Sequence, residues 1–269
     1  MSLTGRHGPT ETAQRAEGRA IDLFQLALLE VASARLPIAE FVVKGGANLR
    51  FFHRSVRRSR DIDFDHTGAR FERFADRVDE MLGGSALRAI LRARALELAD
   101  VRRTKQTATT RRWKFTLVAP GVARAASKIE FSARGRSADH DVAPVDHDLA
   151  RRLGGRAARV ARYGPVASIE QKIGALALRG EIQARDVFDL DHLFRLYPDA
   201  LDDTRAERRT IQVAIARALE LSYDEYRGTV VDYLEEDVAD VLGTEDAWSG
   251  MVLAVTERLE GMLGEEHRG

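Results

Sequence analysis

Two aspartates separated by one residue stand in the segment Asp61-Ile62-Asp63-Phe64-Asp65. Carboxylates alternate with apolar residues there, and this period of two is typical of a strand with one wet face. Asp61 and Asp63 would then point to the same side and repel each other unless a cation neutralises them. Oxygen ligands of this kind suit Mg²⁺ or Mn²⁺, which take the rest of their shell from water and phosphates. A solvated edge strand without a metal is the alternative, and Asp65 would be a supporting carboxylate or an exposed strand end.

A glycine pair precedes this strand. The apolar run Phe41-Val42-Val43 predicts a buried strand that stops at Gly45-Gly46, and we expect a helix over 47–52. Glycine lets the backbone approach a triphosphate, whose negative charge also suits the N-terminus of the following helix. The basic segment 53–60 reads as a loop. This order of strand, glycine turn, helix, loop and Asp-x-Asp strand predicts a magnesium-dependent nucleotide site.

Two later segments carry charges that could complete such a site. In Lys128-Ile129-Glu130-Phe131 the apolar positions predict that Glu130 lies on a strand face opposite the core, as a third carboxylate or a plain surface residue. In the helix expected over 168–179, the apolar residues Ile169, Ile173, Leu176 and Leu178 mark the buried side. Lys172 and Arg179 are therefore expected on one exposed face, to bind phosphate or simply to be solvated.

The two motifs together resemble the AbiEii/AbiGii family of nucleotidyltransferase toxins, in the DNA polymerase β-like superfamily. That family's first motif reads Lys-Gly-Gly-x-x-Leu followed by Arg-x-Ser-x-Asp-hydrophobic-Asp, and residues 44–49 and 58–64 look like it. Its second signature is matched by Lys172, Arg179, Arg185, Asp186 and Asp189. The mycobacterial MenT toxins are similar in both motifs. The resemblance covers residues 20–196, and the later helices match only in being helical.

The resemblance implies roles for single residues. Asp61 and Asp63 would hold the metal, Ser59 would contact phosphate, and Lys172 would bind the triphosphate with help from Arg179. Asp186 would complete the site, and either it or Glu130 would be the third carboxylate. Asn48 stands where the family has Thr-Ala or Ser-Ala near the glycine turn, a departure that leaves the phosphate contacts there open.

The resemblance also implies a reaction: transfer of NMP from an NTP, a pyrimidine nucleotide, to an acceptor hydroxyl. The acceptor would be the 3′ end of tRNA, so that the enzyme blocks translation, and a separate antitoxin protein would be its partner. Transfer to a protein or small-molecule hydroxyl is an alternative. A module that binds Mg-NTP without transfer is another.

The charge of the chain is unevenly distributed although its net value is zero. From residue 201 onward there are 17 acidic and 7 basic residues, whereas residues 1–200 hold 35 basic and 25 acidic ones. A basic body favours a polyanionic ligand. Arginine supplies 37 of the 42 basic residues, so an arginine-rich composition explains the excess equally well. The candidate nucleic-acid contacts are Arg54, Arg57, Arg58, Arg111 and Arg112.

Composition narrows the class of protein further. The chain has 269 residues, 44% of them apolar and 31% charged, the balance of an ordered globular protein. Without cysteine it has no disulfide and no thiolate metal site. No apolar run approaches the roughly 18 residues of a membrane span, and residues 1–14 are too polar for a secretory signal, so we expect no membrane contact and a cytoplasmic location. The histidines (His53, His66, His140, His147 and His192) lack metal-like spacing and are expected in loops or on the surface.

These patterns predict an α+β fold: a polymerase β-like nucleotidyltransferase domain with a mixed sheet, followed by an all-helical region. We expect helices over 12–35 and 71–82, a helix and a strand within 85–110, and an antiparallel pair over 112–118 and 128–132. Residues 135–164 read as loop-rich. A change to helices alone places the domain boundary at 165, with residues 1–165 forming the α/β domain and residues 166–269 the helical domain that completes the active site.

Overall fold

The structure, a computed structural model, describes residues 9–133 and 139–265. Its centre is a mixed sheet with the strand order β3-β4-β5-β2-β1-β7-β6. The strands are β1 (Phe41–Lys44), β2 (Ile62–His66), β3 (Glu97–Thr107), β4 (Thr110–Ala119), β5 (Val122–Ser132), β6 (His140–Pro144) and β7 (Arg159–Tyr163). Strand β2 runs antiparallel to β1 and parallel to β5, so the short strands that carry the motif lie in the middle of the sheet.

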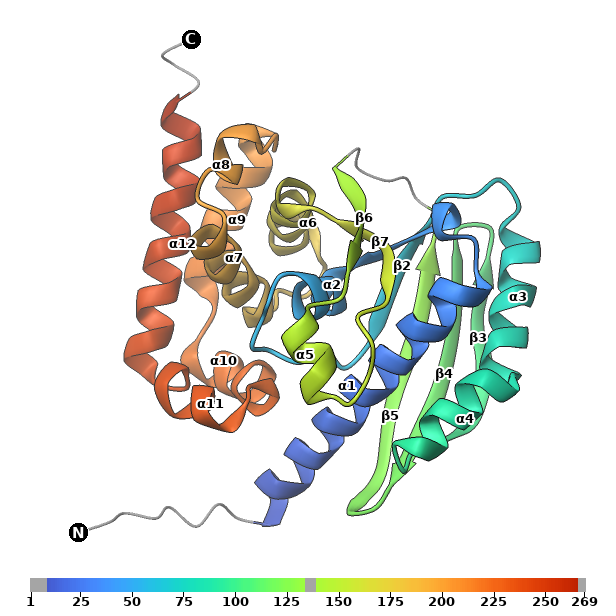
Figure 1. Cartoon of the computed structure of the whole chain (residues 1–269). Helices are drawn as coiled ribbons and strands as arrows, with labels where there is room; N and C mark the ends of the chain where they lie inside the picture. Colours follow the sequence, from blue (N-terminus) through green and yellow to red (C-terminus); the bar gives the residue numbers. More distant parts are fainter. Residues whose placement is uncertain (1–8, 134–138, 266–269) are drawn as a thin grey trace.

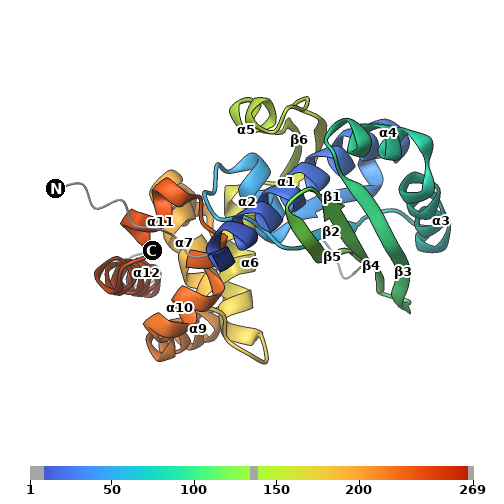
Figure 2. The same ribbon diagram turned by 90° about the horizontal axis from the view of Figure 1, so that it is seen from below.

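Helices cover one face of the long strands β3, β4 and β5. They are α1 (Pro9–Arg35), α3 (Phe71–Gly83) and α4 (Ser85–Ala93). Figure 2 places these helices on one side of β3 and β4, with no helix over the other side of these two strands. Alternate residues of β4, among them Trp113, Phe115 and Leu117, are fully or almost fully buried on the helical side. The strands therefore have one apolar face and one face open to solvent.

The C-terminal helices form a second body beside the sheet (Figure 1). They are α6 (Pro165–Leu178), α7 (Ala184–Leu196), α8 (Ala200–Asp203), α9 (Arg208–Glu220), α10 (Tyr223–Thr229), α11 (Glu236–Leu242) and α12 (Glu245–Glu265). Their buried side chains form a hydrophobic cluster apart from the one under the sheet, and Leu49 of helix α2 (Gly45–Phe52) packs into it. The division at residue 165 stays a prediction.

Most of the expected elements are confirmed, and the α+β class with a mixed sheet and a helical C-terminal part is confirmed with them. The expectation for 135–164 was wrong. Of that stretch, residues 135–138 lie outside the described part, while β6, helix α5 (His147–Arg152) and β7 occupy most of the rest. Strand β7 pairs with β1, and this long-range pairing gives a short, arginine-interrupted segment a strand conformation.

Two short 3-10 helices complete the described chain: η1 (Ile38–Glu40) and η2 (Val231–Tyr233). Within the described residues, no helix combines the length and the apolar character that crossing a membrane requires.

Candidate active site

Asp61 and Asp63 share one cation, the ammonium of Lys128 on β5. Lys128 Nζ lies 3.3 Å from Asp61 Oδ2 and 3.5 Å from Asp63 Oδ1, and the Lys128 backbone amide donates to Asp61 Oδ1 at 3.2 Å. Strand β2 begins at Ile62, so Asp61 is the last residue of the preceding loop and Asp63 lies within the strand. The two carboxylates converge on one point, as the alternating pattern predicts.

The glycine pair sets the distance between helix α2 and these carboxylates. Gly45 has a φ of +67°, a left-handed conformation that favours glycine, and a Cβ there would lie 3.6 Å from Asp63 Oδ2. A Cβ on Gly46 would lie only 2.6 Å from Ser59 Oγ. Ser59 donates from that hydroxyl to the carbonyl of Asp61 at 2.8 Å. The first turn of α2 therefore packs against both the loop before β2 and the side chain of Asp63.

Glu130 lies directly beside Asp63, because β2 and β5 pair in parallel with these two residues in register. Its carboxylate binds Arg112 of β4, with Arg112 Nη2 at 2.5 Å from Glu130 Oε2. Asp65, two residues further along β2, accepts from Lys44 Nζ at 2.5 Å and from the Tyr163 hydroxyl at 2.8 Å. Asp65 is buried, so the expectation of an exposed strand end is wrong, and a supporting role for its carboxylate stays a prediction.

A second group of charges joins α6, α7 and the loop before β2. Lys172 Nζ lies 2.9 Å from Asp186 Oδ1 and 2.6 Å from Asp189 Oδ2. Arg57 binds Asp189 through two hydrogen bonds, of 3.0 and 2.8 Å. Arg179 Nη2 lies 3.4 Å from Asp186 Oδ2. Both aspartates are fully buried and Lys172 is 7% exposed, so this network fixes α6 and α7 against the loop.

The prediction of an exposed Lys172 was therefore wrong. Lys172 projects toward α7, where it finds two carboxylates, and the apolar residues 169, 173 and 176 are buried as expected. Leu178 was also misplaced: it is 74% exposed, because α6 ends there and the chain turns away at Arg179. The spacing of apolar residues could not reveal that α7 covers the polar side of α6.

A cavity of about 420 Å³ opens between the sheet and α6. It is lined from the sheet side by Lys44, Gly45, Asp63, Asp65 and Tyr163, and from α6 and the residue that follows it by Ala167, Glu170, Gln171, Lys172, Ala175 and Arg179. Cations from both sides thus face one space that contains Asp63. This volume falls in the range of small-molecule sites, about 300–1,000 Å³.

The site's electrostatics follow from burial opposed by ion pairs. Desolvation raises the pKa of Asp63, Lys128 opposes this, and the neighbouring Asp61 and Glu130 carboxylates raise it further. Although desolvation lowers the pKa of Lys128, the attraction of Asp63 and Asp61 outweighs it and raises that pKa above its ordinary value. Burial alone would raise the pKa of Asp189, but Arg57 and Lys172 hold it well below the usual range. Asp189 is therefore held in its ionised form by its two cations, whereas the proton affinity of Asp63 is increased by its surroundings.

Asp61 and Asp63 fit a divalent cation, because their oxygens already converge on one positive group. Within the described residues, no cluster of three or more histidine, aspartate or glutamate side chains could hold a metal ion. A cation bound by this pair would therefore draw its other ligands from water and from the phosphates of a substrate, the habit of Mg²⁺.

The candidate nucleic-acid arginines do not form one surface. Arg57 is buried on Asp189, and Arg111 is buried against Glu72 and the ring of Phe71 on the helical side of the sheet. Arg58 is half-buried against Asp22. Arg54 is 76% exposed and pairs with Asp146. Only Arg112 lies on the open face, next to Glu130.

Several residues around the cavity were not predicted from the sequence. Lys44 begins the first motif and Lys128 lies two residues before Glu130, and the sequence pattern predicts no charge role in the site for either lysine. Tyr163 and Asn48 are linked, because Asn48 Nδ2 donates to the Tyr163 carbonyl at 3.0 Å. His66, expected in a loop or on the surface, is buried on β2, whereas His53 lies in the loop after α2 as expected but is buried there. One feature of the sequence indicates Lys44 and Lys128 as site residues: the chain has only five lysines, and three of them, Lys44, Lys128 and Lys172, lie in or beside the motifs.

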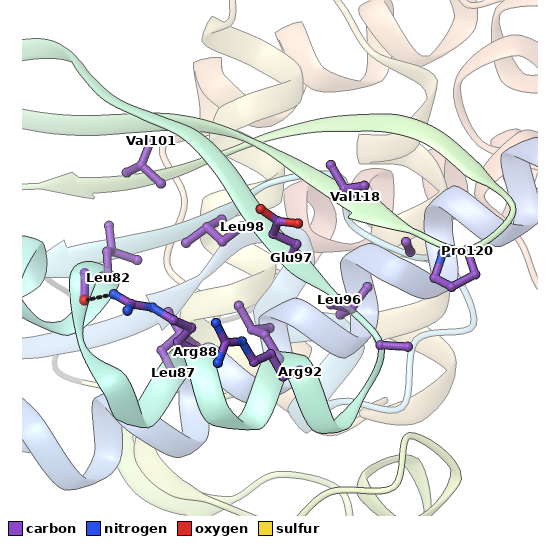
Figure 3. A pocket seen from close by; sticks show the side chains of 14 residues that line it. Leu82, Leu87, Arg88, Arg92, Leu96, Glu97, Leu98, Val101, Val118 and Pro120 are labelled. Carbon is purple, nitrogen blue, oxygen red and sulfur yellow. Dashed lines mark hydrogen bonds between the residues drawn. The ribbon is translucent and has the colours of Figure 1, made fainter.

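A larger cavity, of about 940 Å³, lies elsewhere, between α4 and the β3–β4 hairpin (Figure 3). Its walls are mostly apolar, with Leu87, Leu96 and Leu98 among them, and Arg88 and Arg92 stand on its α4 side. None of the site residues described above lines it, so its size alone does not connect it with the chemistry of the carboxylates.

The profile of one protein family, described as nucleotidyl transferase AbiEii toxin of a type IV toxin–antitoxin system, matches residues 27–257. Helicobacter pylori JHP933 has a similar crystal structure, with a TM-score of 0.54 and 19% identity over 99% of this chain and 98% of that one. The Mycobacterium tuberculosis nucleotidyltransferase toxin MenT4 is similar with a TM-score of 0.57 and 18% identity, over 95% of this chain and 88% of that one. At these identities the two structures support the fold. No curated protein matches the sequence.

Proposed function

The chain belongs to the AbiEii nucleotidyl transferase toxin family of type IV toxin–antitoxin systems, and on that premise we propose that it transfers NMP to the 3′ end of tRNA. Membership makes it a nucleotidyltransferase with an NTP as substrate and an antitoxin as partner. We further propose that the NTP is a pyrimidine nucleotide and that the modified tRNA no longer supports translation.

One observation carries the proposal: carboxylates and cations face each other across a single cavity. Asp63 and Gly45 lie on its sheet side, and Lys172 and Arg179 border it from the helical side. An NTP whose α-phosphate lies near Asp61 and Asp63 can reach these cations with its β- and γ-phosphates. The backbone amides at the N-terminus of α2, which the glycine pair leaves uncovered by side chains, add positive partial charge that favours the triphosphate.

The reaction needs an attacking hydroxyl, a neutralised α-phosphate and a stabilised leaving group. The acceptor oxygen forms a bond to the α-phosphorus, the bond from that phosphorus to the bridging oxygen breaks, and pyrophosphate leaves. Lys172 and Arg179 would neutralise the charge that builds on the leaving group. A divalent cation held by Asp61 and Asp63 supplies Lewis-acid neutralisation at the α-phosphate when bound. Ser59 donates its one hydroxyl proton to the Asp61 carbonyl, so a contact with phosphate at the N-terminus of α2 would require that hydrogen bond to break.

The position of the two remaining carboxylates favours different roles. Glu130 lies in register with Asp63 and is partly exposed, and on this basis we propose that it accepts the proton of the attacking hydroxyl. Asp186 is fully buried and holds Lys172 and Arg179. We therefore assign the third carboxylate to Glu130 and a positioning role to Asp186.

The test is transfer itself. Wild-type protein is incubated with Mg²⁺, total tRNA and each of the four NTPs in α-³²P-labelled form, and both the label on tRNA 3′ ends and released pyrophosphate are measured. We expect label from CTP or UTP to exceed label from ATP or GTP. Asp61→Ala and Asp63→Ala should each lower transfer by at least about 100-fold while a cooperative melting curve is kept, since losing a direct ligand exceeds the usual effect of losing an outer-shell partner.

The alternatives give different results in the same experiment. Pyrophosphate release with label on protein or on a small molecule would replace the tRNA acceptor. NTP binding with neither label nor pyrophosphate would make the chain a binding module. Full transfer by Asp63→Ala would remove Asp63 from the metal site.

A further inference from the structure

One row of side chains crosses five strands of the sheet on the same side. In register, Lys44 of β1 pairs with Asp63 of β2, Asp63 with Glu130 of β5, Glu130 with Arg112 of β4, and Arg112 with Lys105 of β3. Residues paired in register point to the same face of a sheet. The row therefore runs from the edge of the active-site cavity to the free edge of the sheet.

A second row lies beside the first. Lys128 of β5 contacts Asp61, pairs with Lys114 of β4, and Lys114 pairs with Arg102 of β3. Together the rows place Arg102, Lys105, Arg112 and Lys114 on β3 and β4, all on the face that carries Asp63. Their alternate neighbours, among them Trp113 and Arg103, point to the helical side, where Arg103 binds Asp76 and Asp79.

This face is open to solvent. Figure 2 shows β3 and β4 with helices on one side only. Lys114 and Arg102 are exposed, and Lys105 is partly exposed. The side chains of these three residues form no ion pair or hydrogen bond with the rest of the described chain. Three free cations on a bare sheet face are therefore available to an external anion.

The distribution of lysine points the same way. Arginine outnumbers lysine 37 to 5 in this chain, yet all five lysines lie in these rows or at the cavity: Lys44, Lys105, Lys114, Lys128 and Lys172. An ammonium is a compact point charge that binds phosphate oxygens without requiring a planar, bidentate partner. The lysines thus trace a path from the free edge at β3 to the carboxylates.

We propose that the open face of β3, β4 and β5 binds the acceptor RNA, with Arg102, Lys105 and Lys114 holding its phosphates so that its 3′ end reaches Asp61 and Asp63. This surface rests on the proposed function, because it assigns the path of the acceptor toward that site. Three strand spacings separate β2 from β3, about 14 Å. That length matches roughly four stacked nucleotides at 3.4 Å each. The surface differs from the predicted arginine set, of which only Arg112 lies on it.

The experiment measures binding of fluorescein-labelled total tRNA as a function of salt. The test variant is Arg102→Gln/Lys114→Gln, and the matched control is Arg88→Gln/Arg92→Gln, two exposed arginines of α4 on the helical side (Figure 3). The slope of log affinity against log salt is negative, and each lost phosphate contact should reduce its magnitude by about 0.7–0.9. We expect the slope of the test variant to be less steep than that of the wild type by about 1.5, and the control to keep the wild-type slope. Affinity for CTP, measured without RNA, should be the same in all three proteins.

The outcomes separate this surface from the proposed reaction. A wild-type slope in the test variant, or an equal loss in the control, overturns the surface even if tRNA is labelled. Absence of tRNA binding by the wild-type protein also overturns it and would leave the face to an acidic protein partner. A reduced slope in the test variant alone supports the surface, whether or not transfer to the tRNA end is then observed.

Discussion

Lys172 lies between two fully buried carboxylates, Asp186 and Asp189. Its positive charge therefore stabilises the fold, in addition to the role that we propose for it in binding the substrate. Lys172→Met would leave Asp186 with only Arg179 at 3.4 Å, while Asp189 keeps Arg57. Removing one partner of a buried ion pair lowers the free energy of unfolding by about 3–5 kcal/mol. Because Arg179 and Arg57 remain as partners here, we expect Lys172→Met to lower it by about 2–3 kcal/mol. We expect the melting temperature to fall by about 5–10 °C.

A double variant distinguishes stability from catalysis at this position. Lys172→Met/Asp186→Asn removes the cation together with the buried anion that would keep only Arg179, so unfolding in urea should show recovery of at least half of the lost stability. Transfer should stay low, because the cation that faces the triphosphate is still missing. Lys114→Met is the matched control: its side chain is exposed and unpaired within the described chain, and such substitutions usually stay within about 0.5 kcal/mol. Wild-type stability in Lys172→Met would show that the buried pairs contribute little.

A divalent cation bound by Asp61 and Asp63, as we propose, would compete with Lys128 for the same two carboxylates. Lys128→Met should leave Asp61 and Asp63 without their shared counter-ion and lower the stability of the metal-free protein by about 1 kcal/mol, since all three side chains are partly exposed. The same change should increase the rise in melting temperature that Mg²⁺ produces, because no ammonium opposes metal binding. Lys128→Arg keeps the charge and is the control. Equal Mg²⁺-dependent shifts in wild type and Lys128→Met would contradict the competition.

At the scale of the element, the first turn of α2 depends on contact between Gly46 and Ser59. Gly46→Ala would place a methyl group 2.6 Å from Ser59 Oγ, so the loop that carries Asp61 must move. We expect a loss of about 1–3 kcal/mol and a marked fall in transfer. Ser59→Gly in the same chain should restore part of the stability by removing the obstructing side chain.

A glycine of α6 provides the control for this prediction. A Cβ at Gly174 meets nothing within 4 Å, and that residue lies inside a helix. Gly174→Ala should stabilise the protein by about 0.5–1 kcal/mol, as alanine does in helix interiors. If Gly46→Ala is as stable as wild type, α2 does not need the close approach to the loop.

The sequence predicted elements well where one local pattern dominated. Alternation around Asp61 and Asp63, apolar periodicity in α1 and the glycine stop after β1 each correspond to an observed element. Strand β7 escaped prediction, because its residues Arg159 and Arg162 interrupt the apolar pattern and its conformation depends on pairing with β1 and β6. Local propensity is overridden in such a case by long-range hydrogen bonding.

The site was predictable in its carboxylates and less so in its cations. Asp61 and Asp63 carry a motif whose spacing alone fixes their common face. The partners of Lys172, Asp186 and Arg57 depend on how α6, α7 and the loop pack in three dimensions, which no spacing within one helix reveals. The prediction of a nucleic-acid contact for Arg57 was wrong for the same reason: nothing in the basic loop itself reveals that Asp189 of α7 binds this side chain.

Across the whole molecule, buried ion pairs join the helical part to the sheet. Arg50 of α2 binds Asp22 of α1 at 2.9 Å and Glu235 of the C-terminal region at 2.6 Å. Arg57 binds Asp189 of α7. The cavity of the candidate active site lies between the parts that these contacts connect, so the position of α6 relative to Asp63 depends on them.

His53 also joins the sheet to the helical part, through uncharged hydrogen bonds to Tyr163 and Tyr197. These hydrogen bonds make the stability of the protein depend on pH. Its Nε2 lies 2.9 Å from the Tyr163 carbonyl and its Nδ1 lies 3.0 Å from the Tyr197 hydroxyl. A neutral ring can donate to the carbonyl and accept from the hydroxyl at once, whereas the protonated ring cannot accept. Burial lowers the pKa of His53 to about 4 from its ordinary 6.5.

Stability should therefore fall on acidification between pH 6.5 and pH 4. Above pH 6.5 the ring is neutral in both states, and below it the unfolded chain takes up a proton that the folded protein refuses until about pH 4. A difference of this size corresponds to about 3 kcal/mol of unfolding free energy, fully lost near pH 4.

The measurement is urea unfolding at pH 8, 6.5, 5 and 4 for wild type and His53→Gln. The variant should be less stable at pH 8, because its side chain cannot make both contacts in the same geometry, and it should lose about 3 kcal/mol less than wild type between pH 6.5 and pH 4. Parallel pH profiles for the two proteins would show that His53 titrates normally and does not hold β7 and α7 together as a neutral ring.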